Sequence, residues 1–164
     1  MKLLGVENKK FLFQLGDTEK RLLLAVLDRY PVVPPAHQRL SRTGDDQNSQ
    51  HLLNEALADQ RRENKKQLQA LLKSRRRFQR LKTGCRLKLS AGDVEWLLQV
   101  FNDIRVGSWV ILGSPDQDWH LVVDDNTAPH VWAMELSGYF QSRLLEALRH
   151  EQPAAEGRKR RKKP

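Results

Sequence analysis

The sequence predicts a mostly α protein, a small helical bundle around a central apolar helix, with an N-terminal β-hairpin and one long basic helix. Three observations carry this prediction. Residues 90–113 form the longest apolar segment, and their apolar side chains recur at i, i+3, i+4 and i+7, the period of a buried helix. Residues 18–30 and 127–150 repeat that period with one apolar face each. Residues 50–82 are long, basic and mostly polar, as in an exposed helix.

Length and composition predict one domain over residues 1–150, because 164 residues can bury a core of their own. Residues 151–164 contain Pro, Ala and Gly, followed by six consecutive Lys and Arg residues at 158–163. This low-complexity, highly charged composition predicts a disordered basic tail.

The N-terminal segment predicts a hairpin followed by a helix. Residues 3–6 and 11–15 are two apolar runs separated by a polar turn, and the second run alternates as a strand does. An isolated hairpin is marginal in water, so we expect it to pack on helices. The next helix should begin after Asp17, a good N-cap, and stop before Pro31. Residues 36–48 have the composition of a loop.

The middle helix is expected from about Gln50 to Lys82, with Ser49 as its cap and Thr83-Gly84 as its end. Apolar residues cluster near both ends, whereas the middle is polar on every side. That pattern indicates either a solvent-exposed helix or an arm that spans two packed ends. Residues 86–89 then alternate, as a short strand or an extended linker would.

The central helix has clear boundaries. Ser90 can cap it, with Asp93 in the position of a capping-box acid, and Gly113 followed by Pro115 ends it. Residues 119–123 then favour a short edge strand. The last amphipathic helix should follow Thr127 and reach about residue 150.

Three polar residues, Asn102, Asp103 and Arg105, interrupt the apolar central helix. Long charged side chains are rarely buried unless they are paired. Asp103 and Arg105 are two residues apart and so do not face each other on a helix. We therefore expect Arg105 to reach another element, such as a helix-end carbonyl or Glu135. Structural bracing inside the bundle is the favoured interpretation, and a ligand or partner site is the alternative.

The net charge is +9, of which six positive charges lie in the last seven residues. Cations on one broad side of the middle helix, together with the tail, can track a phosphate backbone. Aromatic residues are rare among them, so base stacking is not indicated. The alternatives are a solvated or protein-docking helix face and a solubilising tail. The polyanion-binding candidates are Arg62, Lys65, Lys66, Lys73, Arg76, Arg77, Arg80, Arg158, Lys159, Arg160, Arg161, Lys162 and Lys163.

The sequence gives little support for catalysis, a cofactor or a metal site. The one cysteine, Cys85, excludes an intrachain disulfide and a cysteine-rich zinc site. The five histidines are scattered, and neither a nucleophile-elbow nor a phosphate-loop motif occurs. We therefore expect a protein that is not an enzyme and has no cofactor. The four tryptophans are expected in the core or at its edge, where they can also line a protein-binding groove; they are Trp96, Trp109, Trp119 and Trp132.

No apolar run approaches the length that a transmembrane helix requires. The apolar part of the first residues is too short for a signal peptide. We therefore expect a cytoplasmic protein without a membrane span. The oligomeric state is not predicted.

The order of elements and the segment of residues 93–113 resemble a bacterial family known as domain of unknown function 2017. The residues that carry the likeness are Trp96, Phe101, Asn102, Asp103, Arg105 and Leu112. Phe101 departs from the leucine that is usual in the family. The resemblance implies an N-terminal strand–strand–helix unit, an Arg-rich middle helix and a regulatory or adaptor role. Our leading hypothesis is thus a non-enzymatic binding or adaptor protein with a protein partner. The alternative is an RNA- or ribosome-associated protein that uses the basic middle helix and the tail.

Overall fold

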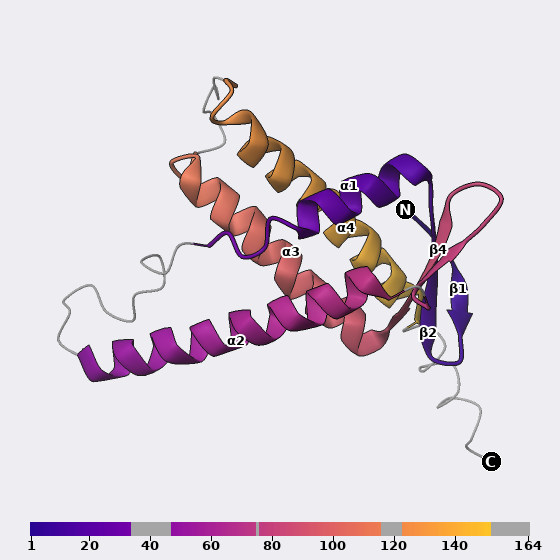
Figure 1. Ribbon diagram of the computed structural model, residues 1–164, viewed down its shortest axis with the longest axis horizontal. Coiled ribbons are helices and arrows are strands. Elements are labelled where there is room, and N and C mark those ends of the chain that lie inside the picture. The colour runs from indigo at the N-terminus through magenta and orange to yellow at the C-terminus, as the bar shows by residue number, and fades with distance from the viewer. Residues whose placement is uncertain (34–46, 75, 116–122, 152–164) are drawn as a thin grey trace, which may run out of the picture.

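The computed structural model describes residues 1–33, 47–74, 76–115 and 123–151, and it is mostly α (Figure 1). Helices and strands of the described residues follow the order β1-β2-α1-α2-β3-β4-α3-α4. Their bounds are β1 Lys2–Glu7, β2 Lys10–Leu15, α1 Asp17–Leu27, α2 Gln47–Lys73, β3 Phe78–Arg80, β4 Cys85–Ser90, α3 Ala91–Ile111 and α4 Ala128–Glu151.

The strands form one antiparallel sheet with the order β1-β2-β4-β3. The expected N-terminal hairpin is present as β1 and β2, but it is half of a larger sheet. Phe13 lies opposite both Leu3 and Leu87, so these three side chains share one face. Phe13 and Leu87 are fully buried and belong to the core that the helices cover. The hairpin is therefore stabilised by its contact with β4 and the helices, as an isolated pair of strands would not be.

The expected end of the middle helix at Lys82 is wrong, because α2 ends at Lys73. The chain then turns, and β3 pairs with β4, with Phe78 opposite Leu87. This pairing packs Phe78 against the core, and the backbone groups of β3 find their hydrogen-bond partners on β4. Gly84 has a φ of 77° in the turn between these strands, so the Thr83-Gly84 signal belongs to a hairpin.

The central helix α3 begins as expected. Ser90 Oγ accepts a hydrogen bond of 3.1 Å from the Asp93 N–H, and the Asp93 carboxylate accepts one of 2.8 Å from the Ser90 N–H. This reciprocal capping box satisfies two N–H groups at the helix start. Most of the predicted apolar stripe is buried, including Phe101, but Ile111 is half exposed.

Helix α4 packs side by side with α3 in the opposite direction (Figure 1). The rings of Phe101 and Phe140 stack with centroids 5.7 Å apart at the centre of this contact. Gln141, next to Phe140, donates a hydrogen bond of 3.2 Å to the Leu98 carbonyl, one turn before Phe101. The helix pair therefore forms the centre of the molecule, and α1 crosses it on one side (Figure 1).

Helix α2 lies against the body only through its C-terminal part, where Leu68 and Leu71 are buried (Figure 1). Its N-terminal half projects beyond α3, and Leu52 there is 63% exposed. The expectation of an arm between two packed ends is thus met at one end only: among the described residues, α2 packs at its C-terminal part and projects at its N-terminal part. None of the described helices combines the length and the apolar character that crossing a membrane requires. The expected strand at 119–123 and the expected tail fall mainly on residues 116–122 and 152–164, outside the described ranges.

Candidate protein-binding site

Asp103 braces the bundle internally. One of its carboxylate oxygens accepts hydrogen bonds from the backbone N–H groups of Val32 and Val33, at 2.8 and 3.3 Å. The other oxygen lies 4.0 Å from Arg61 Nε of α2. Arg61 also donates a hydrogen bond of 3.0 Å to the Val33 carbonyl. Asp103 therefore joins α3, α2 and the segment that follows α1, as the bracing interpretation predicted for this residue.

Gly107 lies one turn after Asp103 and completes this contact. A Cβ atom at Gly107 would lie 2.5 Å from the Val32 carbonyl carbon and 2.5 Å from the Val33 nitrogen. Real Cβ atoms do not approach a backbone so closely, so this position requires glycine. The bare helix surface at Gly107 and the acceptor at Asp103 together hold the Val32-Val33 backbone against α3.

Asn64 links the same three segments a turn further along α2, and it is 4% exposed. Its amide donates to the Tyr30 hydroxyl at 3.1 Å, and its carbonyl oxygen accepts from Trp96 Nε1 at 3.0 Å. Burial is the main cause that raises the pKa of Tyr30, and the negative charge of Asp103 adds to it. Each buried polar group in this network has a partner, so the network fixes how α2 sits on α3.

Asn102 and Arg105 do not share the bracing role of Asp103, so the prediction is wrong for them. Both side chains are exposed, and Arg105 forms neither a hydrogen bond nor an ion pair with any described residue. Glu135, the acid that we expected to pair with Arg105, lines the same groove without such a bond. The helical period explains the split, since Arg105 lies about 200° around the helix from Asp103.

A groove of about 920 Å³ runs between α3 and α4 on the side where Arg105 lies. Three large apolar side chains line it while exposed to solvent: Trp109 and Tyr139, each 38% exposed, and Leu145, 46% exposed. Gly138 forms part of the floor, and a Cβ atom there would meet nothing within 4 Å. Exposed aromatic and apolar residues around a hollow are typical of protein-binding surfaces.

The apolar surface continues from the groove toward the edge of the sheet. Arg143 of α4 lines both the groove and a neighbouring hollow of about 540 Å³ beside β1. In that hollow Leu4 and Val6 are 45% and 42% exposed. Arg143 itself lies over the Tyr139 ring at 5.6 Å and pairs with Glu146 at 2.8 Å. Two adjacent hollows thus share one wall and hold exposed apolar side chains on both sides of it.

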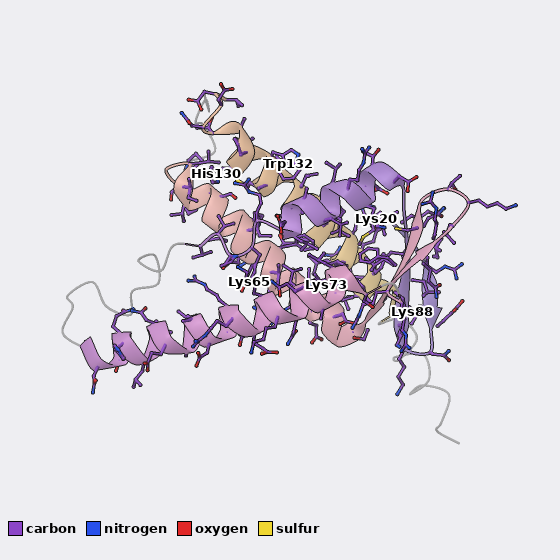
Figure 2. All side chains as sticks on the ribbon, in the orientation of Figure 1. Lys20, Lys65, Lys73, Lys88, His130 and Trp132 are labelled. Atoms are coloured by element: carbon purple, nitrogen blue, oxygen red, sulfur yellow. The ribbon has the colours of Figure 1, made fainter. Side chains whose placement is uncertain are left out.

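The four tryptophans separate into different roles. Trp109 lines the groove, where its Nε1 donates a hydrogen bond of 3.2 Å to the Pro115 carbonyl. Trp96 is tied to Asn64 and is half-buried against the core. Trp132, near the start of α4, also packs against the core (Figure 2). Trp119 lies outside the described residues. Of the three tryptophans that the structure describes, Trp109 is therefore the one that lines the groove.

The basic candidates predicted on the middle helix do not form one helical face, because α2 ends before three of the seven. Arg76 and Arg77 lie in the turn after α2, and Arg80 lies on β3. Arg77 pairs with Asp93 at the start of α3. On α2 itself, Arg62 pairs with Asp59, and Lys66 lies 3.9 Å from Glu63. Lys65 and Lys73 are exposed on the helix (Figure 2). The six tail candidates, Arg158, Lys159, Arg160, Arg161, Lys162 and Lys163, lie outside the described residues.

Sequence reasoning missed Tyr139, Leu145 and Gly138 as surface residues. Tyr139 precedes the buried residue Phe140 by one position, and Leu145 follows the buried residue Leu144 by one position, so both lie at the margin of the apolar stripe of α4. The apolar face of α4 is wider than its contact with α3 requires, and this width was the sequence signal for an exposed apolar surface. Arg105 lines the groove, whereas the favoured interpretation placed it inside the bundle.

The titratable groups of the described residues lie in separate places. Burial raises the pKa of the Cys85 thiol, which keeps it protonated. Among the described residues, His, Cys, Asp and Glu side chains do not gather in threes as a metal ion would require. Asp103 and Arg105 serve separate places, so they do not form a joint acid–base pair.

Comparison of the chain with family models, with curated proteins and with solved structures finds no match in any of the three. The resemblance to domain of unknown function 2017 therefore stays a prediction.

Proposed function

We propose that this chain is a non-enzymatic binding or adaptor protein of the cytoplasm, and that the groove between α3 and α4 holds an amphipathic helix of a partner protein. The observation that carries the proposal is the exposed cluster of Trp109, Tyr139 and Leu145 around one hollow. The regulatory role implied by the resemblance to domain of unknown function 2017 is compatible with it.

The apolar part of the groove suits a helix with apolar side chains on one face. Exposed aromatic rings offer a large apolar area for a partner to cover. Burial of apolar surface stabilises a complex by about 25 cal/mol per Å². The groove follows the packed helix pair, so its walls are held by the Phe101–Phe140 contact. A rigid groove that binds the anchors of an amphipathic helix is a recurrent mode of recognition.

The charges at the groove indicate an acidic partner. Arg105 is exposed beside Trp109 and has no ion-pair partner among the described residues. A carboxylate of the partner would give Arg105 a bidentate, charge-assisted contact. Glu135 on the α4 side would select a basic residue at the other edge of the helix. We therefore propose a helix with apolar anchors and at least one Asp or Glu toward Arg105.

Site-specific photo-crosslinking tests this proposal. A benzoylphenylalanine replaces Leu145 in the groove, and a matched variant carries it at Leu52, which is also exposed but lies on the projecting part of α2. After illumination of native cells, the crosslinked peptide is sequenced by mass spectrometry. We expect one discrete adduct at position 145, on an amphipathic acidic segment, and its loss when Arg105→Glu is added.

The absence of an adduct at position 145 would contradict the proposal, as would equal labelling from position 52. An adduct peptide without apolar periodicity and acidic residues would contradict the stated partner chemistry. The Gly138→Leu variant gives a second check, because its side chain fills the groove from a position where a Cβ meets no atom within 4 Å. It should abolish the adduct while thermal unfolding stays close to that of the unchanged protein.

A further inference from the structure

The face of the sheet that points away from the helices is basic. Directly opposed residues of neighbouring strands share a face. Lys2 lies opposite Gln14, and Gln14 lies opposite Arg86, which in turn lies opposite Gln79. One row of polar side chains therefore crosses all four strands. It alternates with the row of Phe13, which is buried under the helices.

Two more cations lie on this outer face. Lys88 is opposite Leu12, and Lys10 is opposite Ser90, and both positions alternate with buried residues of the inner face. The outer face thus carries four cations, Lys2, Lys10, Arg86 and Lys88, and the acid Glu7, which lies opposite Lys10. None of the four cations has an ion-pair partner among the described residues.

The cations of α2 contrast with those of the sheet. Arg62 and Lys66 each have an acid one turn away on the same helix, and Arg61 is committed to Asp103. A local acid lowers the gain from contact with a phosphate, since the existing pair must be broken or shared. Lys88 lies on the sheet, away from Lys65 of α2 (Figure 2). The unpaired positive charge is therefore denser on the sheet than on the helix where the sequence suggested it.

We propose that the outer face of the sheet binds the phosphate backbone of double-stranded RNA. Residues i and i+2 of a strand are about 7 Å apart, so Arg86 and Lys88 present two cations in line. The face belongs to a four-stranded sheet, whereas the major groove of B-form DNA admits a helix or a two-stranded ribbon. The minor groove of an RNA duplex is wide and shallow and displays 2′-hydroxyls. Gln14, between Lys2 and Arg86, and Gln79, at the end of the same row beside Arg86, have the amides to bind those hydroxyls.

Two other polyanions fit this face less well. Single-stranded nucleic acid is held by stacking of bases on aromatic rings, and the aromatic residues of β2, Phe11 and Phe13, are buried on the inner face. A membrane surface requires apolar side chains that insert between lipids. Leu12 occupies an outer-face position but is 3% exposed, so it cannot insert. The inference is independent of the proposed helix-binding groove, which lies between α3 and α4.

Fluorescence anisotropy with the full chain tests the proposal, using a labelled RNA duplex, a DNA duplex of the same sequence and phosphatidylglycerol vesicles. The Lys10→Gln/Lys88→Gln variant removes two cations of the sheet. The matched control, Lys65→Gln/Lys66→Gln, removes two cations of α2, so the net charge is the same. Lys10 and Lys88 are chosen because the Nε of Arg86 is enclosed and has no hydrogen-bond partner, so changing Arg86 risks the fold.

We expect the unchanged chain to bind the RNA duplex with an affinity that falls steeply between about 50 and about 200 mM salt. The sheet variant should lower that affinity by at least about tenfold and reduce the slope of log K against log salt by between about 1.4 and about 1.8, since each lost phosphate contact removes about 0.7 to 0.9. The control variant should change the affinity less than threefold. Equal losses in both variants would overturn the proposal. So would a salt-insensitive affinity, or binding of the DNA duplex or the vesicles as tight as that of the RNA duplex.

Discussion

The carboxylate of Asp103 on α3 accepts a hydrogen bond of 2.8 Å from the backbone N–H of Val32, 71 residues earlier in the chain. The same oxygen accepts from the Val33 N–H, and Arg61 completes the contact from α2. Replacing Asp103 by Ala leaves two backbone donors without their acceptor and one partly buried guanidinium without its ion-pair partner. We expect a loss of about 2–4 kcal/mol in the free energy of unfolding, measured by urea denaturation.

The neighbouring Asn102→Ala variant is the control for Asp103→Ala. Asn102 is on the same turn but exposed, so its loss should change the free energy of unfolding by less than about 0.5 kcal/mol. An Asp103→Asn variant keeps one acceptor oxygen and should fall between the two. Equal stability of the Asp103→Ala and Asn102→Ala proteins would show that Asp103 does not brace the bundle.

Two glycines of the helix pair should respond to alanine with opposite signs. Gly107→Ala places a Cβ 2.5 Å from the backbone of Val32 and Val33, so the segment must move, at a cost of about 1–3 kcal/mol. Gly138→Ala places a Cβ in open space inside α4 and should stabilise by about 0.5–1 kcal/mol, because alanine loses less backbone entropy in a helix. Thermal unfolding of both variants measures the difference. A Gly107→Ala protein as stable as the unchanged one would mean that the close packing on α3 is absent.

The sequence was sufficient to predict α3, because each signal at its start agrees with the tertiary structure. Ser90 and Asp93 form the capping box that their spacing suggested, and Phe101 is buried where the helical period places it. The bracing role of Asp103 could be expected from the cost of a charge on an apolar helix. The partners of Asp103 could not be expected, since they are backbone N–H groups of a distant segment. Almost every residue has a backbone N–H group, so the sequence does not show which ones Asp103 will bind.

The strand β3 could not be predicted, since its three residues, Phe78–Arg80, have no period of their own. The surrounding basic residues favour a helix by composition, and pairing with β4 overrides that preference. This difference also changes the candidate polyanion site. The cations of β4 alternate with Leu87 and Leu89, and only the register of the sheet shows that they share a face with Lys2 and Lys10.

His130 should make the stability depend on pH below 6.5. Burial, and then the positive charge of Arg29, lower the pKa of His130 from 6.5 in the folded protein. As the pH falls below 6.5, the unfolded chain takes up a proton on His130 before the folded chain does, so the free energy of unfolding decreases. His130→Gln should flatten this decrease, as measured by denaturation at a series of pH values. The same slope in the variant would contradict the assignment to His130.

The ion pair of Asp93 with Arg77 should matter in acid. Burial opposes ionisation of Asp93, but the hydrogen bonds from Arg77 and Ser90 outweigh it and lower the pKa of Asp93 below 3.8. Folding is therefore favoured by ionised Asp93 above pH 3.8, and this contribution is lost as the pH falls through the lower folded pKa. Arg77→Gln removes the charged donor and should cost about 1 kcal/mol at neutral pH. Its stability should also fall less steeply below pH 3.8 than that of the unchanged protein.

Acid unfolding curves followed by circular dichroism give both quantities, and Arg76→Gln, in the same turn but exposed, is the control. Coincident acid curves for Arg77→Gln and the unchanged protein would mean that the pair does not hold the turn to the start of α3.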